Sequence, residues 1–234
     1  MKKNILLLSI ILLYSFSSFA QLKFGTDIYS RYLWRGLDFG DAPAFQPSLS
    51  YTVGGLTVGA WASYAFPTSG TTYSENDLYA SYTFSTESAG SFSAIFTDYY
   101  LPSVGIPFGY YKPTDSNPVA AHTLEGGLSY SGAAKFPISL SIYSNLSNDP
   151  DNSVYIQASY PFTIDDATLT LTTGIVPSKS AYYATADGGI INLSVTASKT
   201  VALSDKFSLP LNVSYINNPT QDKTYMVFGM SLVY

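Results

Sequence analysis

The 234-residue chain has no cysteine, a single histidine, and only 12% charged residues. Without cysteine it can form neither a disulfide framework nor a thiolate metal site. Its formal net charge of −5 argues against nucleic acid as a partner, because phosphate binding requires clustered Lys and Arg. A soluble domain carries about 25% charged residues, so about half of the usual solvating groups are missing.

The sequence is instead rich in apolar and aromatic residues, with a hydrophobic fraction of 46% and 21 tyrosines against two tryptophans. This content is too high for a disordered chain. Beyond residue 21, however, no apolar run is long enough for a helix across a bilayer. The composition therefore predicts a large apolar surface that something other than water covers.

Residues 1–20 have the pattern of a secretory signal peptide. Two lysines precede an apolar run at 5–14, and Ser18 and Ala20 occupy the small positions of a cleavage site. The run is too short for a membrane anchor, which needs ~20 apolar residues. We expect cleavage after Ala20 and a single domain over 21–234.

Apolar residues keep one parity along twelve segments of the remaining chain, with small polar residues, mostly Ser and Thr, at the other parity. An exported chain without membrane helices crosses a bilayer only as a closed sheet, because every backbone N–H and C=O in hydrocarbon needs an internal partner. The sequence thus predicts an all-β fold, a transmembrane antiparallel up-and-down β-barrel of about twelve strands, with ten or fourteen as alternatives and a soluble β-sandwich as the competing interpretation. The segments are 24–34, 45–53, 56–66, 78–84, 91–101, 122–131, 138–145, 153–162, 168–176, 189–200, 207–216 and 225–234.

The connections alternate in length, as expected for short periplasmic turns and longer external loops. Two prolines, Pro47 and Pro210, fall inside or near the start of predicted strands, where we expect either a later strand start or a bulge. The predicted external loops are 36–44, 67–76, 102–121, 146–152, 177–188 and the short 217–222, and the turns between them are 54–55, 87–90, 132–137, 163–167 and 201–206.

Aromatic and apolar residues suggest two roles at the membrane. Tyr and Trp favour the interface between headgroups and hydrocarbon, although core packing in a soluble sheet would also use them. The predicted aromatic girdle is Tyr29, Tyr32, Trp34, Tyr64, Tyr130, Tyr160, Tyr215 and Tyr234. The last segment resembles the C-terminal signal that the barrel-assembly machinery recognises, carried by Met226, Phe228, Met230, Leu232 and Tyr234.

Few charged residues are predicted to face the lumen. Asp27, Arg31 and Arg35 share the lumen parity of the first segment, with neighbours about 13 Å apart along an extended strand, so their partners must come from other strands. With Asp77 and Glu125 they form either a constriction that selects solutes or a network that closes the pore; the sequence leaves both readings open.

The string Ser30-Arg31-Tyr32-Leu33-Trp34-Arg35-Gly36 resembles the first-strand motif of the TorF-like porin family and of related outer-membrane β-barrel proteins. The resemblance continues through 46–48, 58–63, 77–80, 97–100 and the acidic position Glu125, and departs from the family pattern at Leu37-Asp38. It implies an outer-membrane barrel with a pore.

Catalytic and metal chemistry have little support. The lone His122, with Glu125 three residues on, is the one residue available as an imidazole base, and 147–152 is a weak match to a calcium loop. We predict no catalytic residue, no metal site and no cofactor.

The sequence therefore predicts a porin-like channel for passive diffusion of small hydrophilic solutes, in contact with outer-membrane lipid of a Gram-negative bacterium. A non-conducting structural or adhesive barrel is the alternative, and a lipid-modifying enzyme is the third.

Overall fold

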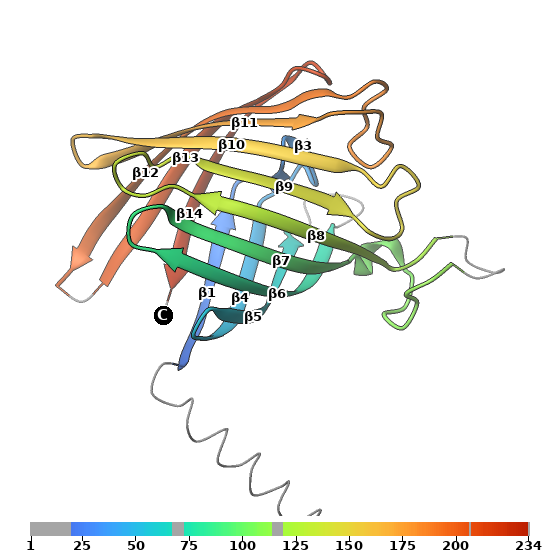
Figure 1. The fold of residues 1–234 in the computed structure, drawn as a ribbon, viewed down its shortest axis with the longest axis horizontal. Coiled ribbons are helices and arrows are strands. Elements are labelled where there is room, and N and C mark those ends of the chain that lie inside the picture. The colour runs from blue at the N-terminus through green and yellow to red at the C-terminus, as the bar shows by residue number, and fades with distance from the viewer. Residues whose placement is uncertain (1–19, 67–72, 114–118, 206, 234) are drawn as a thin grey trace, which may run out of the picture.

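The alternating segments form a closed antiparallel β-barrel in a computed structural model that describes residues 20–66, 73–113, 119–205 and 207–233. Twelve strands make the wall, each paired with its neighbours in chain order, and β1 closes the barrel against β14 (Figure 1). The wall strands are β1 (Ala20–Tyr29), β4 (Ala44–Val53), β5 (Leu56–Ala65), β6 (Ser74–Thr86), β7 (Gly90–Tyr100), β8 (His122–Ser131), β9 (Ser139–Asn145), β10 (Val154–Ile164), β11 (Ala167–Val176), β12 (Gly189–Ser204), β13 (Phe207–Asn218) and β14 (Lys223–Val233). The predicted fold class and strand number are confirmed.

The predicted signal peptide lies outside the described residues, apart from Ala20 at the start of β1. The only helix in the described part of the chain is the short 3-10 turn Pro102–Val104, and no helix there is long and apolar enough to cross a membrane.

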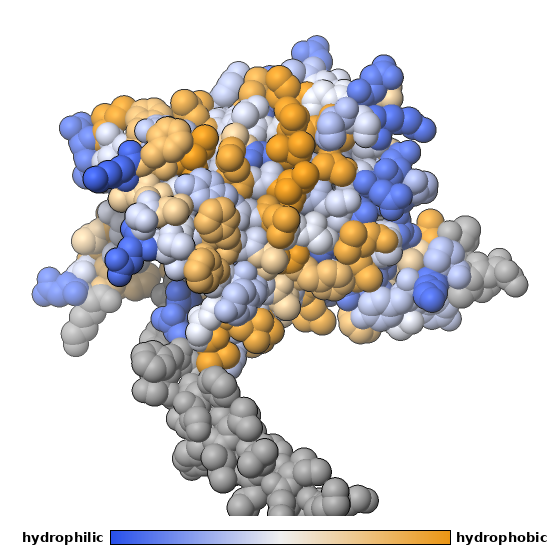
Figure 2. Space-filling view, viewed as in Figure 1, coloured by the Kyte–Doolittle hydropathy of each residue, from blue (hydrophilic) through white to orange (hydrophobic). Residues whose placement is uncertain are grey.

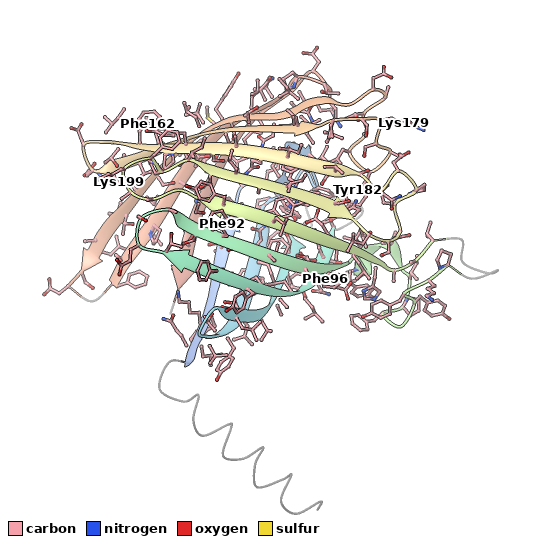
Figure 3. All side chains as sticks on the ribbon, in the orientation of Figure 1. Phe92, Phe96, Phe162, Lys179, Tyr182 and Lys199 are labelled. Carbon is pink, nitrogen blue, oxygen red and sulfur yellow. The ribbon has the colours of Figure 1, made fainter. Side chains whose placement is uncertain are left out.

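Strand periodicity places large apolar side chains on the outer face of the wall. In β14, Met226 and Phe228 are more than half exposed whereas Val227 between them is buried. Phe92, Phe96 and Phe162 likewise lie on the outer face of the wall. Lys179 and Lys199 lie toward opposite ends of the barrel (Figure 3). Apolar and weakly polar side chains accordingly cover most of the visible wall, and strongly hydrophilic ones gather toward the ends (Figure 2).

Connection length alternates as the sequence predicts. The longer loops gather at one end of the barrel and the short turns at the other, on the right and left of Figure 1. The prolines lie where strand pairing lapses: Pro47 pairs with β1 but not with β5, and Pro210 pairs with β12 but precedes the first β13–β14 pair. Neither position needs the N–H that proline lacks. Both expected explanations are therefore wrong, because β4 and β13 begin three residues before these prolines and the pairing register does not shift at either of them.

The first segment, predicted as one strand over 24–34, ends at Tyr29. The chain then leaves the wall and forms a hairpin inside the barrel, β2 (Leu33–Trp34) with β3 (Leu37–Asp38). Its two central turn residues, Arg35 and Gly36, both have positive φ, 53° and 79°, which is the signature of a tight type I′ hairpin turn. Arg35 and Gly36 of the motif therefore form the turn of a hairpin rather than part of a continuous strand.

The hairpin tip lies directly against the wall at a bulge in β12. A Cβ atom on Gly36 would lie 1.8 Å from the backbone oxygen of Ile191, so only glycine permits this approach. Asn218 donates a hydrogen bond to the Gly36 carbonyl at 3.1 Å. Because the register shifts beside Gly174, two consecutive residues of β12, Ile191 and Asn192, are both buried.

Candidate functional site in the barrel lumen

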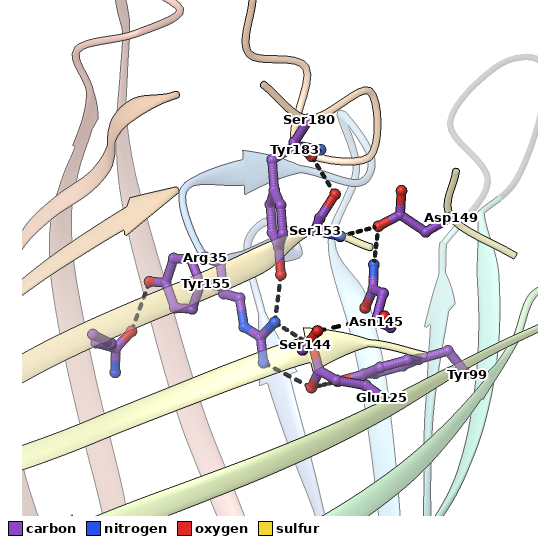
Figure 4. Close-up of polar contacts among 11 residues, drawn as sticks. Arg35, Tyr99, Glu125, Ser144, Asn145, Asp149, Ser153, Tyr155, Ser180 and Tyr183 are labelled. Carbon is purple, nitrogen blue, oxygen red and sulfur yellow. Dashed lines mark hydrogen bonds and ion pairs between the residues drawn. The ribbon is translucent and has the colours of Figure 1, made fainter. Parts of the chain in front are cut away.

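The hairpin places the side chain of Arg35 in the lumen, where it pairs with Glu125 of β8. The guanidinium donates two parallel hydrogen bonds to the carboxylate, at 2.5 and 2.9 Å, and a third to the Tyr183 hydroxyl at 2.5 Å (Figure 4). Tyr99 donates to the same carboxylate at 2.9 Å. The two charged side chains are only 9% and 2% exposed, so this is a buried, bidentate ion pair.

Three aromatic rings surround the guanidinium. Its carbon lies 4.2 Å from the ring centre of Trp34, 4.1 Å from that of Tyr143 and 4.7 Å from that of Tyr155, within the range of cation–π attraction. Tyr143 lies flat on the wall because its cross-strand neighbour is Gly127, where a Cβ would come within 2.3 Å of the ring. Small residues on the wall thus make room for the aromatic cage.

The cage continues into a buried cluster that holds the hairpin. Tyr183 comes from the loop between β11 and β12, which bends inward, and it is 1% exposed. The Ser180 hydroxyl of this loop is hydrogen-bonded to Ser153 at 2.6 Å. The cluster consists of Tyr155, Val176, Tyr183 and Ile191, with Trp34, Leu37, Tyr143 and Tyr182 packed against it.

The other predicted lumen residues do not join this pair. Arg31 lies after the end of β1 and pairs within its own segment, with Asp38 at 2.7 Å and with Asp41. The expectation that Asp27, Arg31 and Arg35 share one strand is therefore wrong, because the chain leaves the wall after Tyr29. Of the five predicted residues, the structure brings together Arg35 and Glu125.

A polar cavity of about 420 Å³ lies in the lumen beside the hairpin. Asp27 and Arg31 both line it, together with the hairpin residues Tyr32 and Leu33. Its wall comes from β1, β4, β12, β13 and β14, with polar side chains at Gln46, Thr196, Ser198, Asn212 and Ser214. The lumen is therefore narrowed by the hairpin, and part of the remaining space is hydrophilic.

Asp77 occupies a different part of the lumen wall and is 7% exposed. It is hydrogen-bonded to Glu75, whose carboxylate also accepts the Tyr73 hydroxyl at 2.7 Å. Glu75 escaped the sequence prediction, although it lies two residues before Asp77 and so shares its parity. The residues of the Arg35 cage carry no comparable signal, since Tyr143, Tyr155 and Tyr183 are ordinary members of a tyrosine-rich chain.

Three predicted girdle residues face the lumen instead of lipid. Tyr29 lines the polar cavity, Tyr32 is 8% exposed among Phe39, Trp61 and Tyr73, and Trp34 belongs to the Arg35 cage. The predictions for Tyr32 and Trp34 are wrong because residues 30–39 are not wall, and that for Tyr29 is wrong because this residue shares the lumen parity of Asp27 on β1. The rest of the set is on the outer face, at Tyr64, Tyr130, Tyr160 and Tyr215, except Tyr234, which lies outside the described residues.

The residues considered for catalysis and metal binding have structural partners. His122 is fully buried, with its ring nitrogens 2.6 Å from an Asp98 oxygen and 2.5 Å from the Phe108 carbonyl oxygen, and it stacks on Tyr111. Both nitrogens are therefore occupied in holding the β7–β8 loop.

In segment 147–152, the weak match to a calcium loop, burial alone would raise the pKa of Asp149, but hydrogen bonds from Ser153, Asn145 and the Asp151 amide outweigh it and hold this pKa below its usual value. Within the described ranges, no group of three or more His, Cys, Asp or Glu could hold a metal ion.

The model of a family described as "Bacterial protein of unknown function (Gcw_chp)" matches residues 16–230. The chain belongs to this family. A search of curated proteins found no significant match.

Among solved structures, a KdgM porin aligns with a TM-score of 0.54 and 9% identity, covering 91% of this chain and 98% of that one. A structure of the KdgM porin in complex with disordered oligogalacturonate gives a TM-score of 0.50 and 9% identity, covering 92% and 98%. The chain therefore has a porin-like outer-membrane barrel fold. Neither comparison carries the TorF-like name, which stays a prediction.

Proposed function

We propose that the protein is an outer-membrane channel for passive diffusion of small hydrophilic solutes, of the type that the TorF-like resemblance implies, with the luminal hairpin as its constriction. The observation that carries this proposal is the polar cavity of about 420 Å³ beside the hairpin. Size, polarity and charge along such a cavity set which solutes pass, and no catalytic group is required.

The surroundings of the barrel follow from the same proposal. The outer face meets the lipid of the outer membrane of a Gram-negative bacterium, after export by the predicted signal peptide and cleavage near Ala20. The alternation of Met226, Phe228, Met230 and Leu232 on β14 is consistent with recognition by the barrel-assembly machinery. A barrel of twelve strands lies between side-chain-filled eight-stranded barrels and open sixteen-stranded porins, so a narrow path is expected.

A non-conducting structural or adhesive barrel is the second candidate, and the buried Arg35–Glu125 pair favours it. This pair fixes the hairpin tip to the wall, and a hairpin that never moves would keep the lumen narrowed. The two candidates differ in whether ions cross the protein.

Single-channel recording of the purified, refolded protein in planar bilayers tests the proposal. We expect a small conductance with weak ion preference, and a larger one in a variant whose residues 31–41 are replaced by a short Gly/Ser linker. Heat-modifiable migration on a gel verifies that both proteins are folded barrels. Absence of conductance in both would overturn the channel proposal in favour of the structural barrel, and equal conductance would show that the hairpin is not the constriction.

A further inference from the structure

The lumen contains a second cavity, of about 300 Å³, against wall strands β4 to β7 and the hairpin. We call it the aromatic chamber. Unlike the polar cavity, it is walled mainly by rings, and one carboxyl group belongs to its lining. These residues are Tyr32, Trp34, Trp61, Tyr79 and Tyr99, with Asp77 as the acid.

The rings are held so that they surround the space. The centre of the Tyr32 ring lies 5.5 Å from that of Trp61, tilted by 53°, and Trp34 meets Tyr99 edge-on at 5.7 Å. Tyr79 lies on Gly59 of the neighbouring strand, where a Cβ would be 2.4 Å from the ring. Because aromatic faces carry the negative part of the ring quadrupole, a chamber walled by several rings attracts cations.

The Asp77–Glu75 pair supplies the charge that such a cation would need, because two carboxyl groups joined by a hydrogen bond hold one proton between them and keep one negative charge. The Oδ1 atom of Asp77 is buried and has no hydrogen-bond partner, although its carboxyl group is bonded to Glu75. Leaving a buried acceptor unpaired is costly. None of the described residues that line the chamber is basic, and the nearby Arg35 is already paired with Glu125.

We propose that the aromatic chamber binds a small quaternary ammonium ion, with its methyl groups among the rings and its charge facing the Asp77–Glu75 pair. The protein uses the same chemistry a few residues away, where the Arg35 guanidinium lies over three rings and against a carboxylate. A hard metal cation fits less well, because it requires a shell of at least about six oxygen ligands. This inference goes beyond the proposed function and does not depend on conductance.

The two tryptophans of the chain, Trp34 and Trp61, both line the chamber, so intrinsic fluorescence reports directly on its occupancy. The refolded protein in detergent is titrated with choline chloride, with sodium chloride at matched ionic strength as the blank. We expect a saturable change in tryptophan emission. The uncharged analogue 3,3-dimethylbutan-1-ol has the same shape and should bind at least about tenfold more weakly, since one contact to a charged group contributes that much.

Two variants separate the chamber from the rest of the lumen. The double variant Glu75→Gln/Asp77→Asn keeps the size of both side chains, removes the charge of the pair and should weaken choline binding by about tenfold or more. Asp27→Asn removes a carboxylate from the polar cavity instead and should leave choline affinity unchanged. The proposal is overturned if wild-type protein of verified heat-modifiable mobility gives no saturable response, if the neutral analogue binds equally well, or if the double variant and wild type bind alike. The analogue comparison needs no variant, so it decides the matter even if the double variant fails to fold.

Discussion

Removal of either partner of the Arg35–Glu125 pair should cost far more stability than removal of both. In Arg35→Met, the Glu125 carboxylate stays 2% exposed and, among the described residues, keeps the Tyr99 hydroxyl as its donor at 2.9 Å. In Glu125→Met, the guanidinium keeps its rings and the Tyr183 hydroxyl but loses both bonds to the carboxylate. Breaking a buried pair in this way costs about 3–5 kcal/mol.

The double variant Arg35→Met/Glu125→Met leaves no buried charge at this place and should be less destabilised than either single variant, because apolar replacement of a whole buried pair is often nearly neutral. Arg31→Ala is the matched control. Arg31 pairs with Asp38 and Asp41, and its side chain is 27% exposed. Loss of these ion pairs should therefore lower the free energy of unfolding by at most about 1 kcal/mol.

The free energy of unfolding is measured in urea, with heat-modifiable gel mobility as the probe, because Trp34 contacts Arg35 and would disturb a fluorescence baseline. The two single variants are also recorded in planar bilayers, where a loosened hairpin should raise conductance in both. If the cost in the double variant equals the sum of the single costs within about 0.5 kcal/mol, the two residues are not coupled, and the reasoning from the buried pair is refuted.

Three further predictions concern the loops and the hairpin turn. Gly36→Ala should displace the hairpin, since the new Cβ would lie 1.8 Å from the Ile191 oxygen; increased conductance with retained heat-modifiable mobility is expected, and an unchanged conductance would argue that the turn tolerates a side chain. His122→Ala should free the loop between β7 and β8, because it removes two hydrogen bonds that contribute ~1 kcal/mol each; chymotrypsin should then cleave at the exposed Tyr110 at least about tenfold faster, and equal cleavage rates would contradict a holding role. The Asp149 carboxyl should titrate below its usual value of 3.8, so its stabilisation of the β9–β10 loop is present above about pH 4 and is lost as the pH falls through the lower folded-state pKa. An NMR titration of this carboxyl checks the shift, and a midpoint at or above 3.8 would count against the hydrogen bonds to Ser153 and Asn145.

Much of the barrel wall follows from local pattern. Parity along β14 and the alternation of long and short connections predicted the closed barrel, because strand geometry forces neighbouring side chains to opposite faces and the two faces meet different media. The sequence also marked Arg35, Asp77 and Glu125 as charged residues in an uncharged surrounding.

The hairpin shows where such reasoning fails. The apolar parity from Phe24 continues past Tyr29 to Tyr32 and Trp34, so residues inside the barrel look like a continuation of the wall. An aromatic side chain satisfies the same pattern whether it faces lipid or a packed lumen. The tip of the hairpin, Gly36, lies against Ile191 of β12, a contact between segments distant in sequence that no local pattern signals.

By itself the sequence predicted a closed β-barrel with an apolar outer face, since alternation and composition are local properties that the sequence displays directly. Only the tertiary structure decided which side chains occupy the lumen inside that wall. It brought Arg35 to Glu125 across ninety positions of sequence, divided part of the remaining lumen between a polar cavity and the aromatic chamber, and turned Tyr32 and Trp34 inward. These features depend on contacts between side chains that are distant in sequence and meet only when the sheet closes. Such contacts leave no short-range pattern in the sequence.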